Sequence, residues 1–116
     1  MGTHRRHEQK NVHPAAELVI DHDRCRAELW DTVQGERTFI GFVGYAEETI
    51  GGEPVWLLMH TIVNDRFGRQ GYARALVTLL LDRLAAEGKR FTSECTYIDQ
   101  YLSRYPEYRK HQALLA

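Results

Sequence analysis

Cysteine is scarce in this sequence: Cys25 and Cys95 are the two thiols among 116 residues. They lie far apart and form no Cys-x-x-Cys pair, which argues against a disulfide framework and against a structural zinc site. Free thiols suit a reducing compartment, so we expect a cytoplasmic protein. The sequence also lacks an apolar run of about 20 residues, the length needed to span a bilayer, and no apolar signal stretch follows Met1. We therefore expect neither secretion nor membrane insertion.

An excess of charge of either sign is also missing. Fifteen basic and sixteen acidic residues leave a net charge of -1. This balance argues against a nucleic-acid-binding protein, which needs a strong positive excess to neutralise phosphates. A local basic pocket for one small anionic ligand remains compatible with it. The length predicts one domain, and 43% hydrophobic with 27% charged residues is typical of a soluble globular protein.

The first fifteen residues have no apolar periodicity. We therefore predict a loose tail over residues 1–15 and a single domain over residues 16–116. The tail contains His4, His7 and His13. No cysteine accompanies these histidines and no rigid element fixes their spacing, so we predict no metal site.

Four segments have the alternation or the β-branched and aromatic composition of strands: residues 17–20, 26–31, 38–46 and 55–63. Two glycines inside the third segment predict a bulge or a close approach by another chain or ligand. Residues 47–54 are predicted to form a hairpin loop. The fourth segment is apolar on both faces, as in a central strand, and a period of two places His60 on the face of Trp56, Leu58 and Ile62.

A long amphipathic helix is predicted over residues 70–87, because apolar side chains recur there at three- and four-residue steps. Gly88 ends it in the left-handed conformation that glycine adopts easily. A short strand at 90–93, a helix at 96–105 capped by Thr96, and a last helix at 106–113 follow. The fold class is thus α/β of the α+β type: a mixed, mainly antiparallel sheet of about five strands, one main helix and two short C-terminal helices.

The segment between the buried strand and the long helix predicts an anion site. The first amides of a helix have no internal partner and carry the positive end of the helix dipole. Gly68 and Gly71 remove side chains that would keep an anion away, and Arg66, Arg69 and Arg74 add positive charge. The segment has neither the Gly-Lys-Ser/Thr of a mononucleotide P-loop nor the Gly-x-Gly-x-x-Gly dinucleotide fingerprint. From spacing alone, a simple two-glycine turn with solvated arginines stays an open alternative.

Several motifs resemble those of the minimal GNAT-like N-acetyltransferases, a family of proteins of roughly 100 residues. The match runs from about Leu18 to the C-terminus and rests on five pieces in order: His60-Thr61, Gly71-Tyr72-Ala73, Gly88-Lys89, Cys95-Thr96-Tyr97 and Tyr105-Pro106-Glu107-Tyr108. The chain departs from the Arg/Gln-x-x-Gly-x-Gly/Ala signature at one point. Gly68 stands where the signature has arginine or glutamine, and an arginine follows at position 69.

The resemblance implies a GNAT fold and acetyl-coenzyme A as the acyl donor. It places the coenzyme pyrophosphate at the loop and first helical turn, namely Arg69, Gln70, Gly71, Tyr72, Ala73 and Arg74. The pantetheine arm is expected beside Thr61, Ile62 and Val63, with the thioester between this strand and the next. Tyr97 and Tyr101 are candidates to contact the coenzyme.

Two residues are candidates for catalysis. Cys95 directly precedes a helix, whose dipole stabilises a thiolate, and the matching cysteine of related proteins is a proposed acetyl-accepting nucleophile. The alternative is a small buried apolar residue. His60 is a candidate general base for the substrate amine, and the alternative is a histidine satisfied within the sheet.

The sequence therefore supports two main functions. The first is an N-acetyltransferase that acetylates an amine, on an exposed lysine or a small polyamine, either directly or through acetyl-Cys95. The second is a non-catalytic module that binds or senses acyl-coenzyme A. A purely structural partner protein is a third and weaker alternative.

Overall fold

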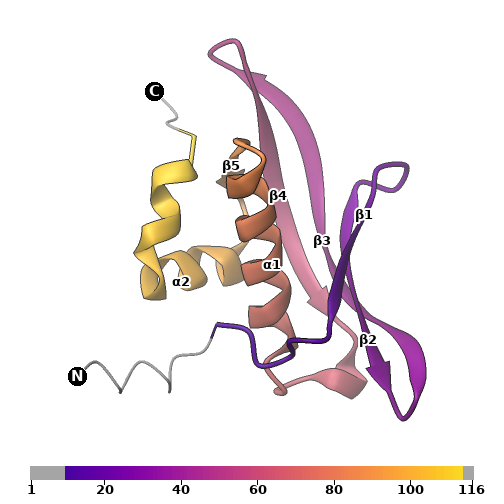
Figure 1. Ribbon diagram of the computed structural model, residues 1–116. Helices are drawn as coiled ribbons and strands as arrows, with labels where there is room; N and C mark the ends of the chain where they lie inside the picture. Colours follow the sequence, from indigo (N-terminus) through magenta and orange to yellow (C-terminus); the bar gives the residue numbers. More distant parts are fainter. Residues whose placement is uncertain (1–9, 114–116) are drawn as a thin grey trace.

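A single sheet lies against two α-helices, all on one side of it (Figure 1). The computed structural model describes residues 10–113. The strands are β1 (Glu17–Asp21), β2 (Arg26–Val33), β3 (Glu36–Ile50), β4 (Glu53–Val63) and β5 (Arg90–Ser93). The helices are α1 (Tyr72–Ala86) and α2 (Thr96–Arg104), with short 3-10 turns η2 (Asp65–Phe67) and η3 (Pro106–His111).

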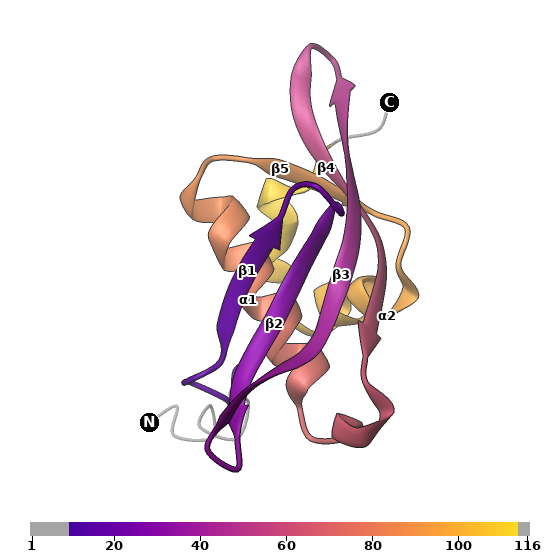
Figure 2. The same ribbon diagram turned by 90° about the vertical axis from the view of Figure 1, so that its right-hand side faces the viewer.

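The strands follow one another across the sheet in the order β1-β2-β3-β4-β5. All neighbours run antiparallel except β4 and β5, which run parallel and are joined by α1 as the crossover. The predicted fold class, a mixed and mainly antiparallel sheet with a main helix on one face, is confirmed. Figure 2 shows the opposite face of the sheet in front, with the helices behind it; we call this side the open face.

The hairpin of β3 and β4 is longer than predicted. The two strands have 15 and 11 residues, so the predicted loop over residues 47–54 is wrong. The turn is confined to Gly51 and Gly52, whose φ angles of 61° and 84° fit a type I′ turn. Charged residues are rare in strands, so the predicted third strand ended at residue 46, just before Glu47. In the structure Glu47 pairs directly with Trp56.

A β-bulge at Met59 inverts the side-chain alternation of β4. Met59 has no partner in β3, because its two neighbours in β4 are paired with consecutive β3 residues. Before the bulge, Trp56 and Leu58 are buried in the core under the helices. After it, the exposed side chains of His60 and Ile62 lie on the open face. The prediction that these four residues share one face is wrong, since one unpaired residue reverses the period of two.

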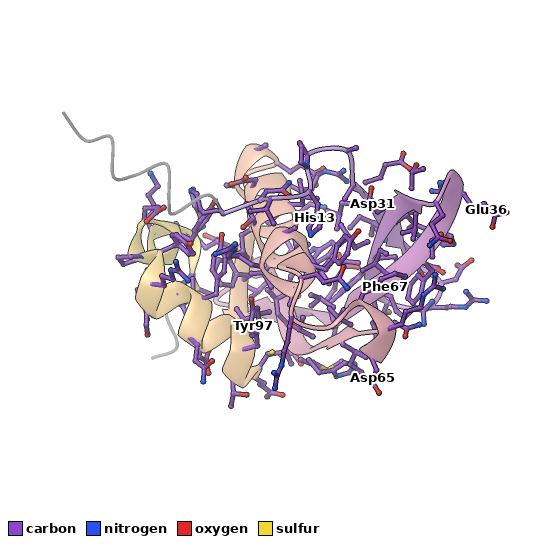
Figure 3. The ribbon with its side chains drawn as sticks, turned by 90° about the horizontal axis from the view of Figure 1, so that it is seen from below. His13, Asp31, Glu36, Asp65, Phe67 and Tyr97 are labelled. Atoms are coloured by element: carbon purple, nitrogen blue, oxygen red, sulfur yellow. The ribbon has the colours of Figure 1, made fainter. Side chains whose placement is uncertain are left out.

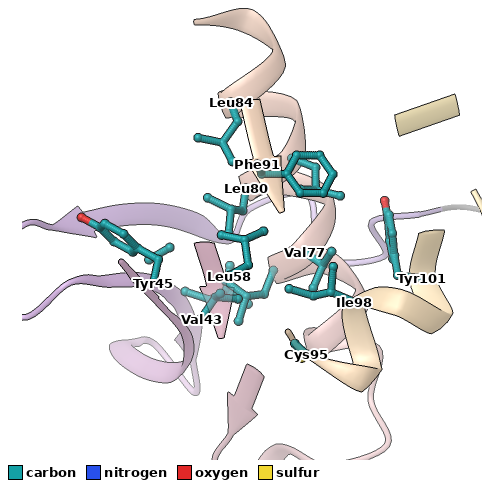
Figure 4. Packing of buried hydrophobic residues seen from close by; sticks show 14 of the residues in the cluster. Val43, Tyr45, Leu58, Val77, Leu80, Leu84, Phe91, Cys95, Ile98 and Tyr101 are labelled. Carbon is teal, nitrogen blue, oxygen red and sulfur yellow. The ribbon is translucent and has the colours of Figure 1, made fainter. Parts of the chain in front are cut away.

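The core forms between α1, α2 and the helix-side face of the sheet (Figure 4). Leu76, Leu80 and Leu84 are almost fully buried at four-residue intervals, as the predicted stripe requires. Gly88 ends α1 with φ of 68°, and Lys89 N donates to Leu84 O at 2.8 Å, which closes the helix. Within the described residues, no helix is both long enough and apolar enough to cross a membrane.

The C-terminal segment differs in detail from the prediction. Helix α2 begins at Thr96, so its N-cap is Cys95 and not Thr96 as predicted. Pro106 does start a further helical segment, but this is a 3-10 turn that ends at His111. Ala113 then donates its amide to Phe91 O at 2.7 Å, so the chain runs back beside β5.

The residues before β1 are held against the domain where the sequence predicts a loose tail. Thr78 Oγ1 donates to Lys10 O at 3.3 Å, and the His13 ring stacks on Tyr72 with centroids 3.7 Å apart. We call residues 10–16 the strap. Polar contacts and one aromatic ring hold it, so it leaves no apolar periodicity in the sequence. His4 and His7 lie outside the described residues.

Candidate active site

The first turn of α1 presents backbone amides that no side chain of the described residues caps. Its N-cap is Gly71, in the left-handed conformation with φ of 82°. The first hydrogen bond of the helix runs from Ala75 N to Gly71 O at 3.0 Å. The amides of residues 72–74 therefore precede the helical ladder and lie at the positive end of the helix dipole. A phosphate or pyrophosphate group matches this arrangement.

A pocket of about 230 Å³ adjoins these amides. Its wall is formed by residues 67–69 and 71–74, with Val63 from the end of β4 and Tyr97 from α2. Arg69 and Arg74 thus lie at the pocket as the sequence predicts. Arg66 does not: it stacks on the Phe67 ring and lines a separate hollow near Arg37. Gln70 is absent from the wall.

The backbone conformations of Gly68 and Arg69 are the reverse of what their residue types favour. Arg69 is left-handed with φ of 60°, a conformation that suits glycine. Gly68 has φ of -64° and ψ of 150°, which any residue adopts. Holding a non-glycine residue in the left-handed region costs about 1–2 kcal/mol. The loop therefore stores strain at the residue whose side chain lines the pocket.

Strands β4 and β5 part next to this pocket. β5 pairs with residues 55–58 of β4. Among the described residues, Met59 pairs with neither neighbouring strand and residues 60–63 pair with β3 alone. The other edge of residues 59–63 therefore exposes backbone groups toward the start of α2. An extended ligand with amide groups can add to such an edge as a further strand. Ile62 contributes its backbone here, because its side chain points to the open face and is 49% exposed.

Cys95 lies where the two strands part, on the helix side of the sheet (Figure 4). The residue is 6% exposed and forms the N-cap of α2. Its Sγ lies 3.4 Å from Thr61 Oγ1, which reaches it from β4. Its amide donates to Ser93 Oγ at 3.1 Å, which fixes the backbone. The thiol thus has a hydroxyl neighbour and lies at the start of a helix.

His60 does not join Cys95. The bulge at Met59 directs its imidazole to the open face, edge-on to Phe42 with ring centroids 5.8 Å apart. A Cβ on Gly44 would overlap the imidazole, so glycine at that position makes room for it. The two predicted catalytic residues therefore lie on opposite faces of the sheet.

Tyr97 is the tyrosine of α2 that lies at the pocket. It also lines a second hollow of about 160 Å³ that runs along α2 to Arg104. Burial raises the pKa of Tyr97, while Arg74 and Arg104 oppose that shift. The Tyr101 hydroxyl is instead bonded to Thr78 Oγ1 at 2.7 Å, inside the core. Of the two predicted coenzyme contacts, Tyr97 is the one that both hollows share.

Two residues to which the sequence analysis gave no role at the loop, His13 and Asp31, contact Tyr72. Tyr72 donates its hydroxyl to Asp31 Oδ2 at 2.7 Å, and burial followed by this bond raises the pKa of Tyr72 to about 12. His13 lies against the same pair, with Nδ1 3.9 Å from the Asp31 carboxylate (Figure 3). Its Nε2 lies 2.6 Å from Gln70 O. The sequence analysis considered His13 only as one of three histidines in the tail.

The parallel strands β4 and β5 thus part beside the uncapped start of α1. The sequence pattern of the GCN5-related N-acetyl-transferases matches residues 26–111. That span runs from the first residue of β2 to the last of η3, so the chain belongs to the GCN5-related N-acetyltransferase family.

One solved structure similar to this chain is a ribosomal-protein-alanine N-acetyltransferase from Brucella melitensis biovar Abortus 2308. The two share 19% sequence identity and superpose with a TM-score of 0.49 over 83% of this chain and 69% of the other. No curated protein matches the chain with significant similarity.

Proposed function

We propose that this protein uses acetyl-coenzyme A to acetylate the amine of an exposed lysine or of a small polyamine. Its family supports acetyl transfer to an amine in general. The observation that carries the finer proposal is the uncapped start of α1 beside a pocket lined by Arg69 and Arg74. That pocket suits the coenzyme pyrophosphate, because amides and guanidinium groups both donate to phosphate oxygens.

The free edge of β4 suits the pantetheine arm. The edge at residues 59–63 leads from the pocket at Val63 toward Cys95. Pantetheine carries two amide groups in an extended chain, so it can pair with the strand edge as a peptide does. This path brings the thioester to the region of Thr61 and Cys95, whose Oγ1 and Sγ atoms are 3.4 Å apart.

The arrangement favours a covalent route through Cys95. The Cys95 thiolate attacks the acetyl carbonyl, a new carbon–sulfur bond forms, and coenzyme A leaves as its thiolate, which then takes a proton. The substrate amine next attacks acetyl-Cys95, loses a proton to a base, and releases the Cys95 thiolate. Thr61 Oγ1 can donate a hydrogen bond to that thiolate in both steps.

A direct route makes a different demand on the protein. The amine would attack the thioester itself, with His60 accepting its proton from the open face. Since His60 is exposed and Cys95 is buried, the two routes depend on residues on opposite faces of β4. Single variants of these residues therefore separate the routes.

The acceptor proposal rests on the open face of the sheet. Among the described residues, the open face of the sheet carries no helix, so nothing there encloses a small acceptor completely (Figure 2). An open surface suits a lysine on a protein or a flexible polyamine better than a metabolite that must be fully enclosed.

The test is turnover of acetyl-coenzyme A with a panel of lysine peptides and polyamines, followed by intact-mass analysis for an acetyl group on Cys95. We expect turnover with at least one amine and an adduct when the amine is omitted. Binding of the coenzyme without turnover or adduct would instead support the binding or sensing module. A ligand at 100 times its dissociation constant stabilises a protein by about 2.7 kcal/mol, so a rise in melting temperature reports binding separately.

A further inference from the structure

The strap reaches the coenzyme loop through one short contact. His13 Nε2 lies 2.6 Å from the backbone oxygen of Gln70, the residue before the N-cap of α1. A carbonyl oxygen only accepts, so Nε2 carries the hydrogen and donates it. The same imidazole stacks on Tyr72, with ring centroids 3.7 Å apart and an interplanar angle of 8°. His13 therefore contacts the residues on both sides of Gly71.

That contact fixes the direction of the Gly71 amide. The peptide unit is planar and trans, so the N–H of Gly71 points opposite to the carbonyl of Gln70. The strap holds the carbonyl on its own side, and the strap does not line the pocket, whereas Gly71 does. From the geometry we infer that His13 is a positioning residue, which locks the Gln70–Gly71 peptide plane so that the Gly71 amide faces the phosphate pocket. This inference rests on the proposed function.

The loop needs such a lock because its own residues restrain it weakly. Gly71, at φ of 82°, has no Cβ to hinder rotation of the neighbouring peptide unit. Gly68 has no side chain that could bond within the loop, at the position where the family signature has arginine or glutamine. The Gln70 side chain makes one long contact, from Nε2 to Arg66 O at 3.5 Å. The short hydrogen bond from the strap is thus the firmest of these restraints.

The strap itself is anchored at several points. Asn11 Oδ1 accepts from the His13 amide at 2.7 Å, which sets the turn that presents the imidazole. Lys10 Nζ donates to Tyr108 OH and to Glu107 Oε2, both at 3.2 Å, and so ties the strap to η3. The His13 side chain is 20% exposed and lies beside Asp31 (Figure 3). His13 is therefore held in place before any ligand arrives.

Two variants separate the hydrogen bond from simple packing. His13→Phe keeps an aromatic ring on Tyr72 but has no donor for Gln70 O. His13→Gln keeps an N–H donor of similar reach but loses the aromatic stack. If His13 acts through the carbonyl, the coenzyme A dissociation constant rises about tenfold in His13→Phe and stays within about threefold in His13→Gln. We expect kcat at saturating acetyl-coenzyme A to stay unchanged in both, because the loss lies in coenzyme binding.

The measurements are calorimetric titration with coenzyme A, steady-state kinetics, and the amide signal of Gly71 in ¹⁵N spectra of the ligand-free protein. Wild-type affinity in His13→Phe, or an equal loss of affinity in both variants, would overturn the lock. An unchanged Gly71 signal in His13→Phe would overturn it as well. If the signal moves but the wild-type protein binds no coenzyme A, the proposed function fails while the structural lock stands.

Discussion

Thr61 and Cys95 face each other where β4 and β5 part, with Oγ1 3.4 Å from Sγ. They come from a strand and a helix start that are 34 residues apart in the sequence, and the contact lies midway along the free β4 edge. A nucleophilic thiol needs a neighbour that stabilises its anion, and this hydroxyl supplies one. The contact makes the role of Cys95 directly testable.

Cys95→Ala should bind coenzyme A as the wild type does. Its rate of acetyl transfer should fall at least about 100-fold, because the nucleophile is gone. Thr61→Val, which keeps the shape without the hydroxyl, should slow transfer about tenfold. The assay is steady-state turnover together with intact mass. Cys25→Ala is the matched control, since Cys25 is an exposed thiol in the turn after β1. Full activity of Cys95→Ala would exclude the covalent route.

Gly71→Val should abolish coenzyme binding. Valine at φ of 82° is strained by about 1–2 kcal/mol, and its Cβ would approach Val12 Cγ2 to 2.8 Å. Gly52→Val is the control, because Gly52 has φ of 84° with open space around it in the distant β3–β4 turn. Both variants should lose stability from backbone strain in thermal melts, and Gly71→Val should lose more because of the contact with Val12. Calorimetric titration should show binding lost in the first alone, and retained affinity in Gly71→Val would remove the phosphate site.

The double change Gly68→Arg with Arg69→Gly should improve the site. It places glycine at the left-handed position and restores an arginine to the position that the signature expects. A Cβ at Gly68 meets one atom closely, Asp65 O at 3.3 Å, so an arginine there needs little adjustment. We expect a gain in unfolding free energy of up to about 1 kcal/mol and coenzyme affinity raised by up to about tenfold. A lower melting temperature or weaker binding would show that the exchange is functional in this chain.

Stability should fall at alkaline pH, and Tyr72 should account for part of the fall. Its pKa is raised from 10.0 to about 12, by burial and then by the bond to Asp31. Between these values the unfolded chain releases the phenolic proton and the folded chain keeps it, so rising pH favours unfolding. Urea denaturation at pH 9 and pH 11 measures the loss, which Tyr72→Phe should reduce. An equal loss in that variant would contradict the assignment.

The sequence predicted the elements that depend on short-range patterns. The four-residue spacing of Leu76, Leu80 and Leu84 identified α1, and Gly88 identified its end. The anion site at Gly71 was predicted by the same logic, because a glycine before a helix and nearby arginines are local features, and it stays a prediction. These predictions needed no knowledge of which strands are neighbours.

Features that depend on pairing between distant segments could not be predicted. The bulge at Met59 exists because β3 and β4 are one residue out of step, and that offset decides which face His60 occupies. The strap was missed for a similar reason. Its anchors, Gln70 and Tyr108, lie far away in the sequence and are contacted through single polar atoms. The spacing of apolar residues in the sequence does not reveal such contacts.

The contacts of Lys10 and His13 also decide what counts as the smallest complete version of this domain. A secondary-structure map would place its first boundary at Glu17, where β1 begins. A chain that starts there would keep every strand and helix but would lose the strap, which connects η3 to the loop before α1. Such a trimmed protein would retain its architecture on inspection and still be deficient in ligand affinity, so shortened versions should be judged by titration and not by folding alone.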